Sequence, residues 1–491
     1  MVRLRQPKPR PSELRTKRLE VRTKRLEVRT PSLRSNPLNS YLLSLSSYLL
    51  SPSSNPLSSY LLSFSSYPLS LSSKTLRSYP LVLCSYLLPL LLLASCQPKA
   101  GTGQFDPLRV AFTATTSPLL DGQLYPSLIL ATNGTNNSEP RTPNPELTSP
   151  FTCTLTSPRD NAVLRILIDS SALNYVTIIQ EILPHRGETY TFAPSVKWKY
   201  DALKKLRQPL PLDLTITCYI NDEQVDIKNL RLNARPVNEC PLSLRTADTI
   251  VDTRWLFAAY VNEDHPYIQQ ILTDILDQNP TLRLTGYQNG TRNVTEQVLA
   301  VWRYALQRGL TYASISCTSN PSPNANVQHI RFFDEIYQNR QANCVDACVF
   351  FASILRKIGL KPVIFVEPCH AYLGYYTDKK RNDIALLETT VTSWVNLPDL
   401  RRSLLPDGTL PQPQLAKIAK YLSEKQLQDW NNGQLTFDQL TDAVARSLFE
   451  KASSYNRETH NANRHLFADP ANISCQQLDI ELLRQKVQPV K

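Results

Sequence analysis

One short segment, residues 343–367, restricts the possible folds more than any other part of the chain. Its first half predicts a helix whose apolar side chains cover most of the circumference, and its second half, from Lys361, is an apolar run typical of a buried strand. A helix and a strand of this kind must both be covered by other elements. The segment therefore predicts a buried helix–strand pair.

The ends of this helix are also marked in the sequence. Asn343 is a good N-cap, and Gly359 suits a left-handed position just past the last turn. Cys344 then lies in the first turn, where unpaired N–H groups and the helix dipole stabilise a thiolate. We expect Asp346 to act as a helix N-terminal charge and not as a catalytic acid.

Two further polar residues follow on predicted strands. His370 begins a strand-like run at 370–376, and Glu388 lies near the end of another at 383–390. A cysteine at a helix N-terminus, a histidine and an acid form a usable set of nucleophile, base and orienting group. In such a set the histidine takes the thiol proton and the carboxylate fixes its tautomer.

Three motifs carry a resemblance to a known family: "ANCVDACVFFASILRKIGLKPV" from Ala342, "EPCHAYLGYY" from Glu367, and "LLETT" from Leu386. In order and spacing they resemble the transglutaminase-like, papain-related superfamily, and most closely bacterial proteins with "GNCVD", "PGHA" and "ETT" motifs. The resemblance covers roughly residues 250–400. It implies a domain with a cysteine at the start of a long helix, and a histidine and an acid on successive strands.

The resemblance also implies roles for individual residues. Cys344 would be the nucleophile, His370 the general base and acid, and Glu388 the orienting acid, where the superfamily usually has Asp. Two positions depart from the pattern, because Ala342 and Cys369 stand where glycine is common. The match does not fix the oxyanion donor; candidates are the Cys344 N–H and a nearby glutamine, namely Gln338, Gln341 or Gln328.

Other chemistries remain open for the same residues. Cys344, Cys348, Cys369 and His370 could form a metal site, but zinc sites usually have two residues between cysteines, and adjacent strand residues point to opposite faces. A disulfide between Cys348 and Cys369 is a second alternative, and a buried Cys348 acting as a small hydrophobe is a third. We expect no metal and no cofactor.

The first 73 residues do not resemble a domain. "RTKRLEV" occurs twice in tandem, at 15–21 and 22–28, and a low-complexity tract of Ser, Leu, Tyr and Pro follows. We interpret residues 1–73 as a leader that is either disordered or translated from a start placed too far upstream.

A targeting signal follows at residues 74–95. Lys74 and Arg77 precede an apolar run of about fifteen residues, which fits a secretory signal better than a membrane span. The run ends in Leu-Ala-Ser-Cys96, which resembles the lipobox of bacterial lipoproteins; an ordinary signal peptide or a weak membrane helix is the alternative. The resemblance implies lipidation of Cys96, a tether at 96–106, and attachment to a membrane of the bacterial cell envelope, on its periplasmic face or at the cell surface.

The charge distribution argues against a nucleic-acid partner. The whole chain has a net charge of +12, but residues 1–95 alone hold 14 Lys and Arg against 3 Glu. The remainder is therefore close to neutral, without a long basic run.

The rest of the chain divides into three segments that differ in their sequence patterns. Residues 107–240 hold short runs rich in Val, Ile, Thr and Tyr, which predict an antiparallel β-sandwich. Residues 241–398 form the transglutaminase-like α+β domain, which begins with helices; Asn293 would cap one of these and Gly309 would end it. Residues 399–491 predict a helical extension, with its last helix in 475–487.

These observations predict an α+β lipoprotein with an N-terminal sandwich and a papain-like domain with flanking helices. The expected reaction is acyl transfer through a thioester on Cys344, with a protein or peptide substrate. Hydrolysis, as in a peptidase or amidase, is slightly favoured over protein cross-linking. The alternative is a non-catalytic binding or scaffold lipoprotein with the same fold.

Overall fold

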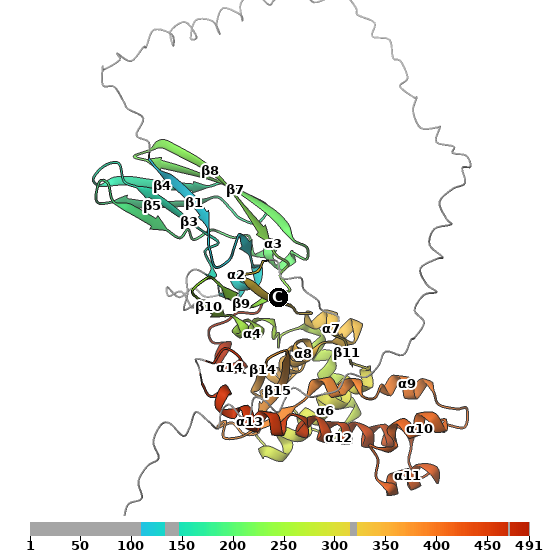
Figure 1. Ribbon diagram of the computed structural model, residues 1–491. Helices are drawn as coiled ribbons and strands as arrows, with labels where there is room; N and C mark the ends of the chain where they lie inside the picture. The colour runs from blue at the N-terminus through green and yellow to red at the C-terminus, as the bar shows by residue number, and fades with distance from the viewer. Residues whose placement is uncertain (1–109, 133–146, 315–321, 470–471, 491) are drawn as a thin grey trace, which may run out of the picture. The chain divides into compact units, whose positions relative to one another are not determined.

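The computed structural model describes residues 110–132, 147–314, 322–469 and 472–490 (Figure 1). Every described residue belongs to the unit Thr102–Lys491. The predicted leader, signal segment and tether, with the lipidation site Cys96, lie outside the described residues. Within those residues, none of the helices combines the length and the apolar content needed to cross a membrane.

The first part of this unit is built from two sheets whose strands pair antiparallel, apart from one short parallel pair. Burial alternates along β3 and β4, as expected for strands with one covered face. One sheet has the order β1-β3-β6, made of β1 (Phe112–Thr116), β3 (Phe151–Thr156) and β6 (Thr189–Phe192). The other has the order β2-β8-β7-β4-β5, made of β2 (Gln123–Leu124), β8 (Glu223–Ala234), β7 (Leu210–Ile220), β4 (Ala162–Ile168) and β5 (Thr177–Leu183).

A strand continues through the predicted domain boundary at 240/241. β9 (Glu239–Arg245) pairs with β10 (Ile250–Asp252) and β12 (Ala325–His329). The hydroxyl of Ser127 also donates to the backbone carbonyl of Glu239 in this strand at 2.8 Å. Ser127 belongs to α2 (Pro126–Thr132), and α3 (Tyr200–Lys205) lies against that helix. The chain around residue 240 is therefore a hydrogen-bonded strand.

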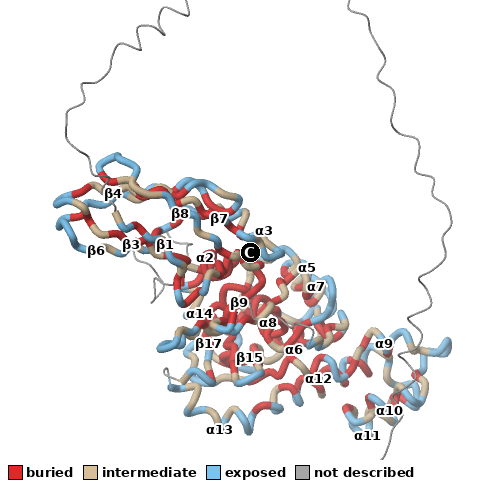
Figure 2. The backbone as a smooth tube through the Cα atoms, turned by 45° about the horizontal axis from the view of Figure 1, so that its top comes forward, coloured by how far each residue is buried: buried red, intermediate tan, exposed pale blue. Residues whose placement is uncertain are grey.

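The predicted buried helix–strand pair is confirmed. α8 (Cys344–Lys357) packs on β14 (Pro362–Glu367) and β15 (His370–Tyr376), and most of the helix is buried (Figure 2). β16 (Ile384–Leu387) and β17 (Gln476–Asp479) complete a four-stranded antiparallel sheet in the order β16-β15-β14-β17. The sheet thus joins residues more than a hundred positions apart.

Helices and short elements make up the rest of the described chain. α12 lies beside α6 and β16, and the fully buried Trp302 of α6 donates to the carbonyl of Ala445 at 3.2 Å (Figure 1). The other elements are η2 (Arg254–Leu256), α4 (Phe257–Tyr260), α5 (Pro266–Gln278), α6 (Gly290–Arg308), β11 (Thr311–Tyr312), α7 (Phe333–Asn339), β13 (Gln341–Ala342), η3 (Thr389–Ser393), α9 (Leu397–Arg402), α10 (Gln412–Ala419), α11 (Glu424–Asn431), α12 (Phe437–Tyr455), α13 (Arg457–Phe467) and α14 (Ile480–Leu483).

Two local predictions are wrong. α6 begins at Gly290, one turn before the expected cap at Asn293, whose side chain instead donates to Thr285 at 3.2 Å. The helix predicted over 475–487 is mostly absent, because β17 extends along β14 and only α14 follows. The apolar residues in this segment fit the spacing of a helix and also that of a strand. Pairing with β14 selects the strand. The end of α6 at Gly309, in the left-handed region, is confirmed.

The strand assignment at β17 makes the first prediction. Leu478 is 4% exposed, so Leu478→Ala should lower the free energy of unfolding by about 2–5 kcal/mol. Gln477→Ala, at the exposed neighbouring position, should change it by less than about 0.5 kcal/mol. Urea unfolding of the two variants measures the difference. Equally small effects would show that this segment does not pack against the sheet.

Candidate active site

Cys344 is the first residue of α8, and reciprocal hydrogen bonds fix the start of this helix. The Asn343 side chain accepts from the N–H of Asp346 at 2.8 Å, and the Asp346 carboxylate accepts from the N–H of Asn343 at 3.1 Å. The predicted N-cap is therefore confirmed. Cys344 is half-buried, and its thiol lies at the positive end of the helix dipole.

Asp346 contributes a negative charge at the helix terminus and also forms a buried ion pair. Its fully buried carboxylate forms an ion pair with Arg331 at 2.6 Å and accepts from the Arg331 N–H at 2.9 Å. Burial raises the pKa of Asp346, although hydrogen bonds from Asn343 and Arg331 oppose that effect. This pair holds the segment before α7 against the first turn of α8. The sequence predicted the helix charge but not the ion pair.

His370 is the first residue of β15 and follows a tight turn from β14. It stands opposite Glu367, with Pro368 and Cys369 between them. Cys369 is exposed and has φ of 63°, in the left-handed region that favours glycine. This backbone conformation is a physical reason for the glycine that is common at the position in proteins with similar motifs.

The carboxylate of Glu388 is fully buried and accepts four hydrogen bonds. His370 donates from Nε2 at 2.8 Å and Asn456 from its side-chain amide at 2.5 Å. Thr390 donates twice, from its N–H at 2.9 Å and from its hydroxyl at 2.7 Å. Burial alone would raise the pKa of Glu388, but the hydrogen bonds from His370 and Thr390 outweigh it and lower this pKa.

His370 joins this carboxylate to the thiol. The thiol of Cys344 interacts with the His370 ring, and since Glu388 holds Nε2, Nδ1 is the ring nitrogen left to face the thiol. The hydrogen bonds with Cys344 and then Glu388 raise the pKa of His370 to about 10, against the effect of burial. The imidazole therefore holds its proton beside the thiol more firmly than a free histidine would.

The three glutamines predicted as oxyanion donors lie on different elements. Gln338 on α7 donates to the hydroxyl of Tyr267 at 3.0 Å, and Gln341 is exposed on β13. Gln328 on β12 donates to the carbonyl of His329 at 2.9 Å. Their role stays a prediction, and the N–H of Cys344 at the helix terminus is the donor nearest to the thiol along the chain.

The structure does not support the two rival chemistries. All seven cysteines within the described ranges are free, so the disulfide between Cys348 and Cys369 is wrong: the first is fully buried next to Thr389 and the second is exposed. Among the described residues there is also no group of three or more His, Cys, Asp and Glu side chains placed to hold a metal ion.

Two residues at the site were missed by sequence reasoning. Asn456 comes from the junction of α12 and α13, 68 positions after Glu388, and nothing in its surroundings marks it. Tyr312 on β11 is 40% exposed; burial raises its pKa, and the nearby Cys344 and Glu388 add to the shift. Tyr312 therefore lies near the thiol and reaches solvent.

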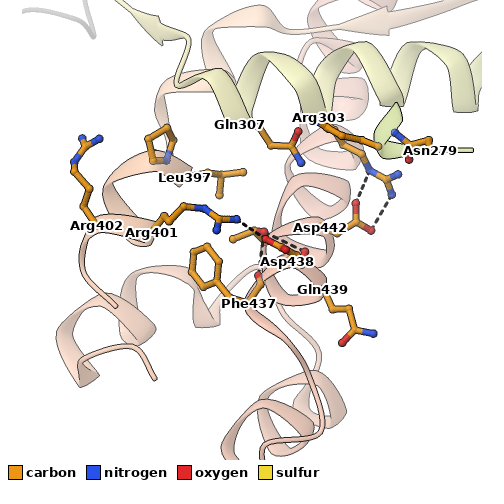
Figure 3. Close-up of a pocket in the computed structure, with 13 residues that line it drawn as sticks. Asn279, Arg303, Gln307, Leu397, Arg401, Arg402, Phe437, Asp438, Gln439 and Asp442 are labelled. Carbon is orange, nitrogen blue, oxygen red and sulfur yellow. Dashed lines mark hydrogen bonds and ion pairs between the residues drawn. The ribbon is translucent and has the colours of Figure 1, made fainter. Parts of the chain in front are cut away.

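A cavity of about 810 Å³ lies elsewhere, between α6, α9 and α12 (Figure 3). Its lining residues include none of Cys344, His370 and Glu388. Its arginines are neutralised locally, because Arg303 pairs with Asp442 and Arg401 pairs with Asp438 (Figure 3). The residues that line this cavity include no cysteine, serine or histidine.

Comparison of the chain with models of known protein families and with curated protein sequences found no match. The function of the protein is therefore inferred from its motifs and from the geometry of the site.

The opposite pKa shifts of Glu388 and His370 predict how the stability of the site depends on pH. A lowered carboxyl pKa contributes stability above about pH 4.3, which is lost as the pH falls. A raised histidine pKa contributes stability below about pH 6.5, which is lost as the pH rises through about 10. The wild-type advantage over Glu388→Gln should therefore be largest near pH 5–6, at roughly 2–4 kcal/mol, and should shrink on both sides.

Urea unfolding at several pH values measures this advantage. Glu450→Gln, an exposed substitution on α12, is the matched control and should change stability by less than about 0.5 kcal/mol. An advantage over Glu388→Gln that stays constant from pH 4 to pH 10 would contradict the assigned ionisation states.

Proposed function

We propose that this protein is a cysteine-dependent acyltransferase of the transglutaminase-like, papain-related superfamily. The observation that carries the proposal is the position of His370, which interacts with the Cys344 thiol and donates a hydrogen bond to the buried Glu388 carboxylate. In this proposal residues 241–398 form the catalytic domain and 399–491 its extension. The extension contributes Asn456 to the site and β17 to the sheet, which supports their assignment to one domain.

The proposed N-terminal domain, residues 107–240, is a β-sandwich. Its two sheets pair almost entirely antiparallel, and β1 of one sheet lies against β8 of the other, which supports this arrangement. We propose that this domain has a binding or positioning role.

The proposed reaction begins with attack of the Cys344 thiolate on an amide carbonyl. A sulfur–carbon bond forms, and the carbonyl oxygen takes negative charge near the N–H groups at the start of α8. The protonated His370 then donates its proton to the leaving amine as the carbon–nitrogen bond breaks, which leaves a thioester. His370 next accepts a proton from water as the water oxygen bonds to the thioester carbon. The sulfur–carbon bond then breaks, which releases the carboxylic acid product and restores the thiolate.

Water is the proposed acceptor, which makes the protein a peptidase or amidase. The half-buried Cys344 and the one-third exposed side chain of His370 leave the site open to solvent. A lysine amine as acceptor would give a cross-link by the same steps. We also propose a lipid anchor at Cys96 and a place in the bacterial cell envelope, which makes envelope proteins or cell-wall peptides the proposed substrates.

Trapping of the thioester tests the proposal. The protein is mixed with a peptide library, quenched in acid and analysed by peptide mass spectrometry. We expect an acyl group on Cys344, none in Cys344→Ala, and formation slowed at least about 100-fold in His370→Ala, because the base is lost.

The exposed thiol of Cys369 supplies the control. Cys369→Ala should form the Cys344 adduct at the wild-type rate. An adduct on Cys369 alone, or no adduct and no cleaved peptide in any form of the protein, would refute the proposed activity.

A further inference from the structure

A second hollow lies near the end of η3. It has a volume of about 480 Å³ and is lined by Trp394, Lys420, Tyr421 and Lys451, which we call the aromatic–lysine pocket. Trp394 is 43% exposed, and its ring packs edge-on against Tyr455, 59% exposed, at a centroid distance of 5.8 Å. Two large aromatic side chains exposed side by side are a common feature of ligand-binding surfaces.

The charge of this pocket is not balanced by the protein. Lys420 and Lys451 are both exposed, and within the part of the chain that the structure describes neither forms an ion pair with an acidic side chain. The ammonium group of Lys420 lies 5.1 Å from the centre of the Tyr421 ring. The arginines of the larger cavity, in contrast, each have a carboxylate partner. The aromatic–lysine pocket thus presents two unneutralised positive charges beside an apolar surface.

The pocket is connected to the cysteine site by η3. Glu388 caps the start of this helix and Trp394 caps its end. η3 also packs against α8 and against β11, whose Tyr312 is exposed near the thiol. Six residues at a rise of about 2.0 Å separate the two caps by roughly 12 Å.

We propose that the aromatic–lysine pocket binds an acidic segment of the peptide substrate whose amide Cys344 attacks. Lys420 and Lys451 pair with the carboxylates of one or two Glu or Asp residues, and Trp394 covers a neighbouring apolar side chain. Two cations in a small hollow match one or two carboxylates, whereas a nucleic acid would need a longer basic track. This assignment of substrate class rests on the proposed function.

A binding measurement without turnover tests the pocket. The probes are two fluorescein-labelled peptides, Gly-Ala-Phe-Glu-Glu-Ala-Gly and the same sequence with Gln in place of both Glu. Anisotropy titrations use the full protein carrying Cys344→Ala. We expect the Glu peptide to bind at least five times more tightly than the Gln peptide, and 0.5 M NaCl to remove most of the difference, since exposed ion pairs are screened by salt.

Paired variants locate the effect. Lys420→Gln with Lys451→Gln should raise the Kd of the Glu peptide about five- to tenfold and leave that of the Gln peptide unchanged. Lys204→Gln with Lys205→Gln makes the same charge change at exposed positions outside the pocket, and should have no effect. Trp394→Ala should weaken binding of both peptides severalfold.

Two outcomes overturn the inference: equal affinities for the Glu and Gln peptides, or equal losses in the pocket and control variants. Because the binding test needs no thiol, its failure is distinct from failure of the proposed function. Selective binding without any thioester in the wild-type protein would refute the activity alone. A thioester that forms equally fast with both peptides would refute the pocket alone.

Discussion

The site depends on one buried charge, the carboxylate of Glu388. An ionised carboxylate is costly to remove from water, and it stays ionised here because four hydrogen-bond donors surround it. The donors come from three segments: the start of β15, the first turn of η3 and the junction of α12 and α13. Since each donor must be in place to offset the desolvation, Glu388 fixes these segments relative to one another. The start of β15 and the junction of α12 and α13 are thus held by the same carboxylate that orients His370.

The second constraint is the start of α8. Asn343 and Asp346 close the first turn, and Arg331 neutralises the buried Asp346. This arrangement fixes Cys344 in the first turn of α8. His370 lies between the Cys344 thiol and the Glu388 carboxylate, and its interactions with both raise its pKa. A thiolate and an imidazolium that stabilise each other are the physical basis of the proposed acyl transfer.

The sequence predicted those features of the fold and of the candidate site that depend on local sequence patterns. The apolar run after Asn343 marks a buried helix, and the order of Cys344, His370 and Glu388 on successive elements marks the candidate site. It could not predict Asn456, because that contact depends on where a distant helix ends. β17 was predicted as a helix for a similar reason: pairing with the edge of β14 opposite β15, not the local spacing of apolar residues, selects the strand. The aromatic–lysine pocket was missed as well, since its residues come from separate helices and share no motif.

The central claim is that Cys344 and His370 form an ion pair, and the alkylation rate of Cys344 as a function of pH tests it most directly. Peptide mass spectrometry after brief treatment with iodoacetamide follows Cys344, and the exposed Cys369 serves as an internal reference. An ordinary thiol loses reactivity below about pH 8.5. The ion pair predicts that Cys344 stays reactive at pH 6–7 in the wild type and loses this advantage in His370→Ala. If Cys344 is inert, or follows the same pH curve as an ordinary thiol in both proteins, the claim is contradicted.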